Sequence, residues 1–406
     1  MLSFEDALQA LMEAARPVAE IRDLPLEAAA GRVLAAAQVA TVNVPPLDNS
    51  AMDGYAVRSA EVAAAVAGGL ALSVSQRIAA GRLGEPLRVG SVARIFTGAP
   101  VPPGADAVVM QEHCQPGAAD GNAVLFRQAP QPWENIRRVG EDMQRGAHIL
   151  PAGIRLRPQD VALAAAAGIA RLPVYRRLRV ALLLTGDELV MPGHPLPPGA
   201  IYDSNRYALC AQLEALGCEV RTFGPVADQL VPTRQALLQL VAENDLVLTS
   251  GGVSVGEEDH VKAAVESIGK LALWKVAIKP GKPLAFGEIE AHGKRAWFVG
   301  LPGNPVSSFI TFATLVRPFV LKLQGLQRVL PRHFALPAAF SRPAGEPRTE
   351  FLRVRINAAG RLELFANQSS AVVTSLAWSD GLVQLPPDRA VSPGDAVAFI
   401  PFSEVI

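Results

Sequence analysis

The sequence predicts a multidomain protein of the α/β plus β class, in which an α/β domain with a mainly parallel sheet is flanked by β-rich segments. Two apolar runs, Val180–Thr185 and Leu246–Thr249, are typical of strands buried on both faces of a sheet. Helical patterns of about ten residues alternate with them, which is typical of βαβ units. The chain has 406 residues, which is longer than a domain with a single hydrophobic core usually is, and this length indicates roughly two to four domains.

The first 175 residues alternate between helical and β-rich patterns. Residues 3–20 carry apolar side chains at helical spacing, and Ser3 is placed to cap that helix. The proline-rich segment 44–50 breaks the pattern. From 55 to about 139, short Val, Leu and Ile runs separated by Gly and Pro predict a β-rich insertion. A helical pattern then returns, chiefly at 160–169.

The α/β region follows from residue 179. Its expected elements, in chain order, are a strand at 180–185, a helix at 205–217, a strand at 219–226, a helix at 233–243, a strand at 246–249 and a helix after the glycine loop at 251–256. Ligands of such sheets gather where strands end and loops enter helices. After Pro331 the helical patterns stop, and 334–406 predicts the short strands of a small β-barrel or sandwich.

Composition excludes several function classes. Half of the residues are hydrophobic and 19% are charged, and 38 basic residues balance 38 acidic ones, which does not indicate a surface for nucleic acid. Three cysteines without CxxC spacing fit a reducing compartment better than a disulfide framework or a zinc site. The N-terminus has no signal-peptide pattern, and no uncharged apolar run approaches the roughly 20 residues of a membrane helix. We therefore expect a soluble cytoplasmic protein.

Three lysines, Lys275, Lys279 and Lys282, surround a Pro-Gly turn, and Gly300–Ser307 forms a second Gly/Pro turn that opens an apolar helix. Lysines at this spacing can project together, and a Pro-Gly turn exposes backbone N–H groups. The helix N-terminus adds the positive end of its dipole. The pattern indicates a phosphate or oxyanion site, and the alternative is a pair of ordinary turns with solvated lysines.

Acidic residues follow the expected strands of the α/β region. Glu188, Asp228 and Asp259 come after three of them, each in a loop near glycine. Carboxylates at the carboxyl edge of a parallel sheet can hold Mg²⁺, which prefers oxygen ligands. A structural alternative stays open, because Ser254 and Glu257 fit a capping box at the start of the next helix.

Other polar candidates have alternatives of the same kind. Asp53 and Thr97, each before a glycine, fit simple turn chemistry. Asp203 and Ser204 fit either the cap of the following helix or a contact to a ligand. From the residues alone, the sequence predicts an α/β enzyme that binds a phosphorylated anion with Mg²⁺.

Eight motifs carry a resemblance to a known family. They are Pro45–Ala56, Ile95–Val109, Asn135–Asp142, Thr185–Leu189, Ile201–Asn205, Ser250–Gly256, Lys275–Pro283 and Leu301–Ser307. In this order they resemble the molybdopterin molybdenumtransferases, to which the C-terminal part of gephyrin also belongs, over essentially the whole chain. The resemblance implies a transferase that inserts molybdate into adenylylated molybdopterin, releasing AMP and giving molybdenum cofactor with the help of Mg²⁺.

The resemblance also implies an architecture and partners. The implied domains are a discontinuous N-terminal helical domain at 1–50 and 140–175, a β-rich inserted domain at 51–139, a molybdopterin-binding α/β domain at 176–328 and a C-terminal β-barrel at 329–406. Members of the family form elongated homodimers with the site between the α/β domain of one subunit and the N-terminal region of the other. A molybdopterin adenylyltransferase would act upstream, and cofactor-maturation proteins would act downstream.

The residue patterns and the resemblance together give the candidate site. The candidate catalytic residues are Asp53, Thr97, Asp142, Glu188, Asp228 and Asp259, of which the last three are also the candidate metal ligands. The candidate substrate- and anion-binding residues are Arg137, Asp203, Ser204, Gly251, Gly252, Ser254, Lys275, Lys279, Lys282, Pro302, Pro305 and Ser370.

Two positions depart from the family pattern. His260 stands where the family usually has an aromatic residue, and Ser369-Ser370-Ala371 stands in place of Gly-Ser-Gly, so only Ser370 carries over. Two alternative functions stay open. One is a related α/β enzyme that uses the same pterin or nucleotide pocket for adenylyl transfer or hydrolysis, and the other is a gephyrin-like scaffold.

Overall fold

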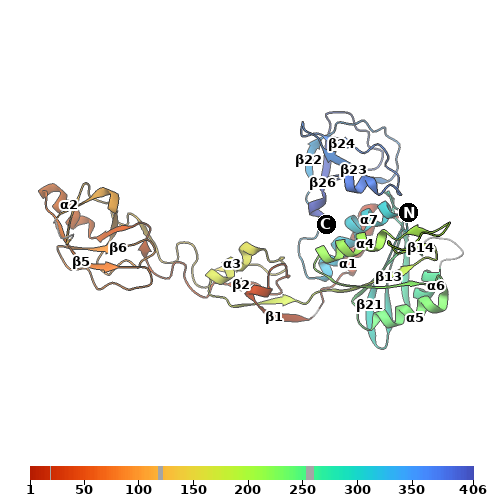
Figure 1. The fold of residues 1–406 in the computed structure, drawn as a ribbon, viewed down its shortest axis with the longest axis horizontal. Helices are drawn as coiled ribbons and strands as arrows, with labels where there is room; N and C mark the ends of the chain where they lie inside the picture. The colour runs from red at the N-terminus through yellow and green to blue at the C-terminus, as the bar shows by residue number, and fades with distance from the viewer. Residues whose placement is uncertain (19, 118–121, 253–259) are drawn as a thin grey trace.

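The chain is elongated, and its computed structural model describes residues 1–18, 20–117, 122–252 and 260–406 (Figure 1). A β-rich tip with helix α2 (Ser59–Gly68) forms one end. A narrow middle part carries α3 (Pro158–Ala166), and the α/β domain and the C-terminal sheet lie together at the other end. The predicted multidomain α/β plus β class is confirmed.

The α/β domain is built on a six-stranded sheet of order β16-β13-β17-β21-β20-β18. Its strands are β13 (Arg179–Thr185), β16 (Glu219–Val226), β17 (Leu246–Ser250), β18 (Gly269–Lys275), β20 (Pro283–Ala291) and β21 (Lys294–Leu301). The strands β16, β13, β17 and β21 are parallel, whereas β20 runs antiparallel to β21 and β18. β17 is buried along its whole length and β13 at every residue after the first, as their apolar sequences predicted.

Helices cover both faces of this sheet. They are α4 (Asn205–Ala215), α5 (Leu230–Val241), α6 (His260–Glu266), α7 (Pro305–Thr311) and α8 (Arg317–Leu323). Residues of α5 and α6 share one hydrophobic cluster with the sheet, and residues of α4, α7 and α8 share a second cluster. The predicted order of strands and helices is therefore observed, with helix ends shifted by a few residues.

Helices α7 and α8 form one helical stretch, Pro305–Leu323, joined by a π-helical segment at Phe312–Val316. Pro318 has no N–H to donate, and its ring would clash with the carbonyl of residue 314 in a regular α-helix, so a wider turn relieves the conflict. By length and composition the stretch qualifies as a membrane span, but 83% of its apolar window is buried inside the protein. It is a core helix of this fold.

Helix α1 (Phe4–Ala14) is shorter than the predicted 3–20. Ser3 caps it as expected, because its Oγ accepts from the N–H of Asp6 at 3.0 Å. The helix ends early because Pro17 disfavours helical backbone in the residue before it, and Ala15 is already extended. Phe4 and Leu11 are buried in the same core as α8 and the parallel sheet.

The tip and the middle part are made of short strands. A six-stranded sheet of order β7-β4-β6-β5-β9-β8 forms the tip. Its strands are β4 (Gly54–Val57), β5 (Leu72–Ile78), β6 (Ser91–Ile95), β7 (Ala107–Met110), β8 (Cys114–Pro116) and β9 (Ala123–Phe126). The middle part pairs β1 (Ile21–Pro25) with β12 (Arg171–Tyr175), β2 (Gln38–Val39) with β11 (His148–Leu150), and β3 (Asn49–Ser50) with β10 (Ile136–Arg137).

The C-terminal region forms a third sheet, of order β19-β23-β25-β26-β22, with β24 pairing to β23. Its strands are β19 (Ile278–Lys279), β22 (Phe334–Pro337), β23 (Thr349–Ile356), β24 (Leu362–Leu364), β25 (Gly381–Leu385) and β26 (Ala396–Pro401), accompanied by helix α9 (Thr374–Trp378). β19 belongs to the basic loop after β18, so the two regions share a sheet. The β content is as predicted, and closure into a barrel stays a prediction.

We predict that Phe319→Ala lowers the free energy of unfolding of the α/β domain by about 3–5 kcal/mol, because it opens a cavity in the core. Phe319 is fully buried, and its ring centroid lies 5.3 Å from that of Phe286 and 5.5 Å from that of Trp297. Urea unfolding followed by tryptophan fluorescence measures the loss. The control is Phe334→Ala, at a side chain that is 43% exposed. Equal costs for the two variants would contradict the core role of Pro305–Leu323.

Candidate functional site

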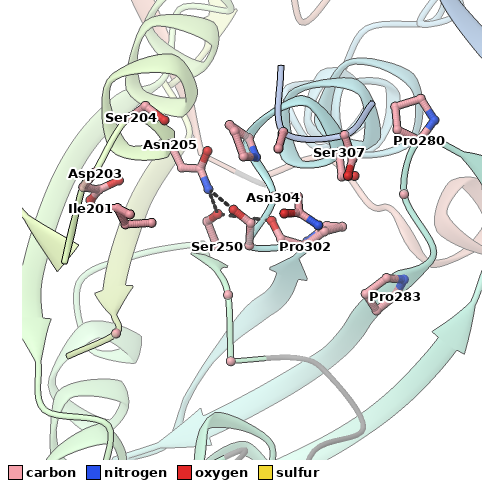
Figure 2. A pocket seen from close by; sticks show the side chains of 18 of the residues that line it. Ile201, Asp203, Ser204, Asn205, Ser250, Pro280, Pro283, Pro302, Asn304 and Ser307 are labelled. Carbon is pink, nitrogen blue, oxygen red and sulfur yellow. Dashed lines mark hydrogen bonds between the residues drawn. The ribbon is translucent and has the colours of Figure 1, made fainter. Parts of the chain in front are cut away.

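An open pocket of about 1050 Å³ lies at the carboxyl edge of the parallel strands. The loops after β13, β17 and β21 all reach it, because parallel strands end at the same edge of a sheet. The segment that joins β15 (Ile201–Tyr202) to α4 forms one wall, and residues 368–371 of the C-terminal region form another. Figure 2 shows polar side chains from these loops facing one another.

Many of the predicted residues line this pocket. They are Glu188, Asp203, Ser204, Asp228, Gly251, Gly252, Lys279, Lys282, Pro302, Pro305 and Ser370. Lys275 is exposed at the end of β18, opposite Pro283, and is not among the lining residues. Ser254, Glu257 and Asp259 lie outside the described residues.

Two glycines shape the loop after β17. Gly251 and Gly252 have φ angles of +98° and +64°, which side chains other than glycine rarely allow. A Cβ at Gly252 would lie 2.5 Å from Cγ2 of Val261. The loop therefore presents backbone, without side chains, to the pocket at these two positions.

Asn205 ties three segments of the pocket together. Its Nδ2 donates to Oγ of Ser250 at 2.7 Å and to the carbonyl of Gly303 at 2.7 Å (Figure 2). Ser250 Oγ in turn lies 3.3 Å from the carbonyl of Pro302 and 3.3 Å from Oγ of Ser308. The amide of Asn205 thus fixes the ends of β17 and β21 relative to the start of α4. Asn205 lies in the motif Ile201–Asn205, but no sequence pattern indicates this role, because Ser250 and Gly303 are 45 and 98 positions away.

Asp203 is a buried carboxylate in the pocket wall. The side chain is only 3% exposed, and Oδ1 accepts from the N–H of Arg206 at 3.0 Å, which serves the first turn of α4. Its other oxygen, Oδ2, has no hydrogen-bond partner in the described part of the chain. One oxygen therefore serves the first turn of α4, as the capping interpretation expects, and a contact between the other oxygen and a ligand stays a prediction.

Lys279 forms ion pairs with two carboxylates and is not simply solvated. Its Nζ lies 2.6 Å from Oε2 of Glu346 and 3.2 Å from Oε1 of Glu350. Arg348, which also lines the pocket, donates to Glu346 at 2.6 Å. The hydrogen bond from Arg348, and then that from Lys279, lower the pKa of Glu346 to about 2 against the opposing effect of burial. Glu346 therefore stays ionised and holds both cations at the pocket wall.

Sequence analysis missed the three residues Glu346, Arg348 and Glu350. They stand in a polar run of the C-terminal region, and Glu346 is 67 positions from Lys279. The pairing depends on β19 lying beside β23, with Lys279 opposite Glu350. No local pattern in the sequence indicates that a two-residue strand of the basic loop joins the C-terminal sheet.

Asp53 and Thr97 contact each other at the tip. Oδ1 of Asp53 accepts from the backbone N–H of Thr97 and from its hydroxyl, both at 2.8 Å. These two bonds, the backbone one first, hold the pKa of the Asp53 carboxyl below its ordinary value. These bonds join two segments 44 positions apart and are not the local turn contacts that the sequence suggested, and they leave a partly exposed, ionised carboxylate.

Arg137 and Asp142 lie on the segment that links the tip to the middle part. Arg137 stands opposite Asn49 in the β3–β10 pair, and the N–H of Asp142 donates to the carbonyl of Val44. The tip and its connecting segment lie at one end of the chain and the pocket at the other (Figure 1). Within one chain, these residues and Asp53 and Thr97 do not join the pocket.

The residues of the pocket suit a hard cation. Glu188 and Asp228 supply carboxylate oxygens from the ends of two adjacent parallel strands, β13 and β16. Mg²⁺ is usually held by one or two protein carboxylates together with phosphate oxygens of a substrate and water. Outside the gaps at 19, 118–121 and 253–259, no group of three or more His, Cys, Asp or Glu side chains forms a metal cluster. Glu188 and Asp228 are therefore at most two candidate carboxylate ligands, a number that Mg²⁺ accepts when a phosphorylated ligand and water supply the rest.

The fold and the pocket define an α/β enzyme domain whose ligand site lies at the carboxyl edge of a parallel sheet and is completed by a C-terminal β region. Three family models match successive parts of the chain. Residues 2–168 match the MoeA N-terminal region (domain I and II), 181–322 match a probable molybdopterin binding domain, and 335–402 match the MoeA C-terminal region (domain IV).

Individual relatives agree over the full length. A molybdopterin molybdenumtransferase of Haemophilus influenzae is 40% identical over 100% of both chains. Molybdopterin molybdenumtransferase 2 of Mycobacterium tuberculosis is 37% identical over 93% of both. The crystal structure of the molybdopterin biosynthesis MoeA protein from Pyrococcus horikoshii superposes with a TM-score of 0.83 at 28% identity, covering 99% of this chain and 100% of that one. The chain belongs to the molybdopterin molybdenumtransferase family, and it is an enzyme of molybdenum-cofactor biosynthesis.

We predict that Asn205→Ala weakens molybdopterin binding about tenfold, because the loops after β17 and β21 lose their shared donor. The loss of two hydrogen bonds also costs about 1–2 kcal/mol of stability. Binding is measured by fluorescence titration and stability by urea unfolding. The matched control is Asn357→Ala, which removes an asparagine that accepts from the N–H groups of Ala359 and Arg361 in an exposed turn. If the dissociation constant of Asn205→Ala equals that of the wild type, the role assigned to this amide is contradicted.

Proposed function

We propose that this enzyme inserts molybdate into adenylylated molybdopterin in the cytoplasm, releasing AMP and giving molybdenum cofactor in a Mg²⁺-dependent reaction. The observation that carries the proposal is the pocket of the α/β domain, where cations and carboxylates meet at the carboxyl edge of the sheet in a member of this family. A molybdopterin adenylyltransferase would supply the substrate, and cofactor-maturation proteins would receive the product.

The charges of the pocket suit these substrates. Adenylylated molybdopterin carries phosphate groups and molybdate is a dianion, so binding needs fixed positive charge. Lys279, Lys282 and Arg348 line the pocket, and the N-terminus of the Pro305–Leu323 helix opens onto it. Because Glu346 already orients Lys279 and Arg348, these cations lose little conformational freedom when an anion binds.

Carboxylates serve a different part of the same reaction. Glu188 and Asp228 would hold the Mg²⁺ ion, with Asp259 as the third candidate ligand. A bound Mg²⁺ would polarise phosphate oxygens and neutralise charge that develops on them. The free oxygen of Asp203 suits an N–H donor of the ligand, such as those on a pterin ring.

The remaining candidate residues require a second subunit. Asp53, Thr97, Arg137 and Asp142 lie at the opposite end of the chain from the pocket, so one chain cannot place both sets around one substrate (Figure 1). We infer a two-fold homodimer in which the tip of each chain reaches the pocket of its partner. In such a dimer the partly exposed carboxylate of Asp53 would face the substrate from the partner side.

The direct test is an assay of the purified protein with adenylylated molybdopterin, molybdate and Mg²⁺. The expected result is stoichiometric AMP and cofactor that activates a molybdenum-free apoenzyme. Release of AMP without active cofactor would instead identify a hydrolase, and no AMP under any metal condition would reject the proposal.

We predict that Asp228→Asn slows Mg²⁺-dependent AMP release by about tenfold or more and raises the Mg²⁺ concentration needed for half-maximal rate, because a ligand oxygen loses its charge. The control is Glu266→Gln, an exposed acid of α6 away from the pocket lining. Both variants should retain the thermal midpoint of the wild type. A normal Mg²⁺ dependence of Asp228→Asn would remove this residue from the metal site.

We predict that Asp53→Ala and Asp228→Ala, each nearly inactive alone, complement each other when mixed. Random exchange makes about half of the dimers hybrid, and each hybrid has one intact and one doubly damaged site. Activity should therefore recover to about a quarter of the wild-type value. Native mass spectrometry confirms the exchange. Exchange without recovery would show that each site is built from a single chain.

A further inference from the structure

A second cavity, of about 170 Å³, lies where the middle part of the chain joins the α/β domain. It is lined by residues from five places: the segment around Gly31, Arg155, the Tyr175–Arg177 connection between β12 and β13, the turn after α4 near Gly217, and Gln324. Four of its lining residues are arginines and none is acidic. The cavity shares no residue with the pocket described above.

Arg155 forms the inner wall of this cavity. Its guanidinium donates to the carbonyls of Gly31 at 3.1 Å and Leu216 at 2.9 Å, and to Oε1 of Gln324 at 2.8 Å. All three acceptors are neutral. Within the described residues, no carboxylate forms an ion pair with Arg155. Burial lowers the pKa of this guanidinium. A guanidinium has five N–H groups, so donors remain after these three bonds.

Arg32 and Arg177 add two more cations without carboxylate partners. Arg32 donates to the carbonyl of Tyr175 at 2.9 Å, again a neutral acceptor. Arg177 is exposed, and within the described ranges its side chain forms neither an ion pair nor a hydrogen bond. The pKa of Arg32 is lowered by burial first and then by the positive charge of Arg177. Both residues line the same cavity, so their like charges face a shared space.

The acidic residues nearby serve other cations. Asp245 and Glu20 pair with Arg176, the fourth arginine of the lining, at 2.6 and 2.9 Å. Glu219 interacts with Arg32 only at longer range, and its carboxylate lies 3.8 Å from Arg179. Three guanidiniums therefore surround the cavity without local neutralisation. Such an arrangement costs free energy unless a counter-ion shares the space.

We propose that this arginine cavity is a second anion site, which binds a tetrahedral oxyanion: inorganic phosphate or the phosphoryl group of a small phosphate monoester. Guanidinium groups suit this ligand because their N–H groups match pairs of phosphate oxygens. The volume far exceeds the roughly 10–15 Å³ that one water needs and falls below the roughly 300 Å³ where drug-sized ligand pockets begin. The cavity therefore accommodates a phosphate group and not a whole nucleotide.

Binding there would join two parts of the molecule. Arg32 belongs to the middle part, Arg177 to the connection into β13, and Arg155 already reaches across to the end of α4. An oxyanion that bridges them would neutralise their repulsion and reduce motion at the junction. The rival explanation is that Arg155 only caps the C-terminus of α4, where a cation is favourable. That explanation leaves Arg177 without a role and leaves Arg32 only its bond to the carbonyl of Tyr175.

The test is hydrogen exchange of the full-length protein in phosphate and in chloride at equal ionic strength. Phosphate should slow exchange in peptides covering 29–34 and 213–218, with saturation. Arg177→Gln, which changes an exposed side chain, should weaken this effect about tenfold, and Arg32→Gln should act in the same direction. The matched control is Arg221→Gln, at an arginine that is 75% exposed and paired with Glu243. It should bind phosphate as the wild type does.

Further arms separate the source of the anion from non-specific effects. If glycerol 3-phosphate, a small monoester, protects the same peptides at tenfold lower concentration than phosphate, the ligand is a monoester, and the reverse order identifies free phosphate. In anion-free buffer Arg177→Gln should raise the thermal midpoint, because repulsion with Arg32 disappears, whereas a purely structural arginine would lower it. The proposal is overturned if phosphate and chloride give the same exchange at these peptides, or if Arg177→Gln responds as the wild type does.

Discussion

The common carboxyl edge of β13, β17 and β21 is the constraint on which the functional end of the molecule depends. Their register sets Leu183 beside Thr249 and Ser250 beside Leu301, so three chain segments leave the sheet at one place. Apolar side chains bury both faces of these strands, and this burial fixes the register. The positions of the polar loops are therefore set by the packing of the strands that they follow. Asn205 then needs only two hydrogen bonds to hold the loops together.

The C-terminal sheet completes the pocket through charge and backbone contacts together. β19, which is part of the basic loop, pairs with β23, and the ion pairs of Lys279 with Glu346 and Glu350 stand at that junction. The N–H of Val306, at the start of α7, donates to the carbonyl of Ser370. An otherwise unsatisfied helix N-terminus is thereby joined to the loop that lines the opposite wall. The pocket cations therefore depend on a region more than 60 residues further along the chain.

Sequence patterns predicted three of the six strands of the α/β sheet, β13, β16 and β17, because buried parallel strands have a clear apolar signature, whereas β18, β20 and β21 were not predicted. β16 has the bounds that the sequence predicts, and β13 and β17 differ by one residue. The N-terminal helix was predicted too long because the apolar pattern continues past the point where Pro17 stops helical backbone. Residues that line the pocket were predictable where a motif contains them, as for Gly251 and Gly252. Partners such as Glu346 for Lys279 were not, because a two-residue strand that joins another sheet leaves no periodic signal.

Because the chain is elongated, the junction between the middle part and the α/β domain determines where the tip lies relative to the pocket. The tip carries Asp53 and Thr97 as a hydrogen-bonded pair, and the pocket carries its own cations and carboxylates. In the proposed dimer, the distance and direction from tip to pocket would have to be controlled. In each chain that direction is set where β1 and β12 enter the α/β domain, beside the arginine cavity. A small rotation there moves the tip through a much larger arc, so contacts such as those of Arg155 with Gly31, Leu216 and Gln324 bear directly on whether two half-sites meet.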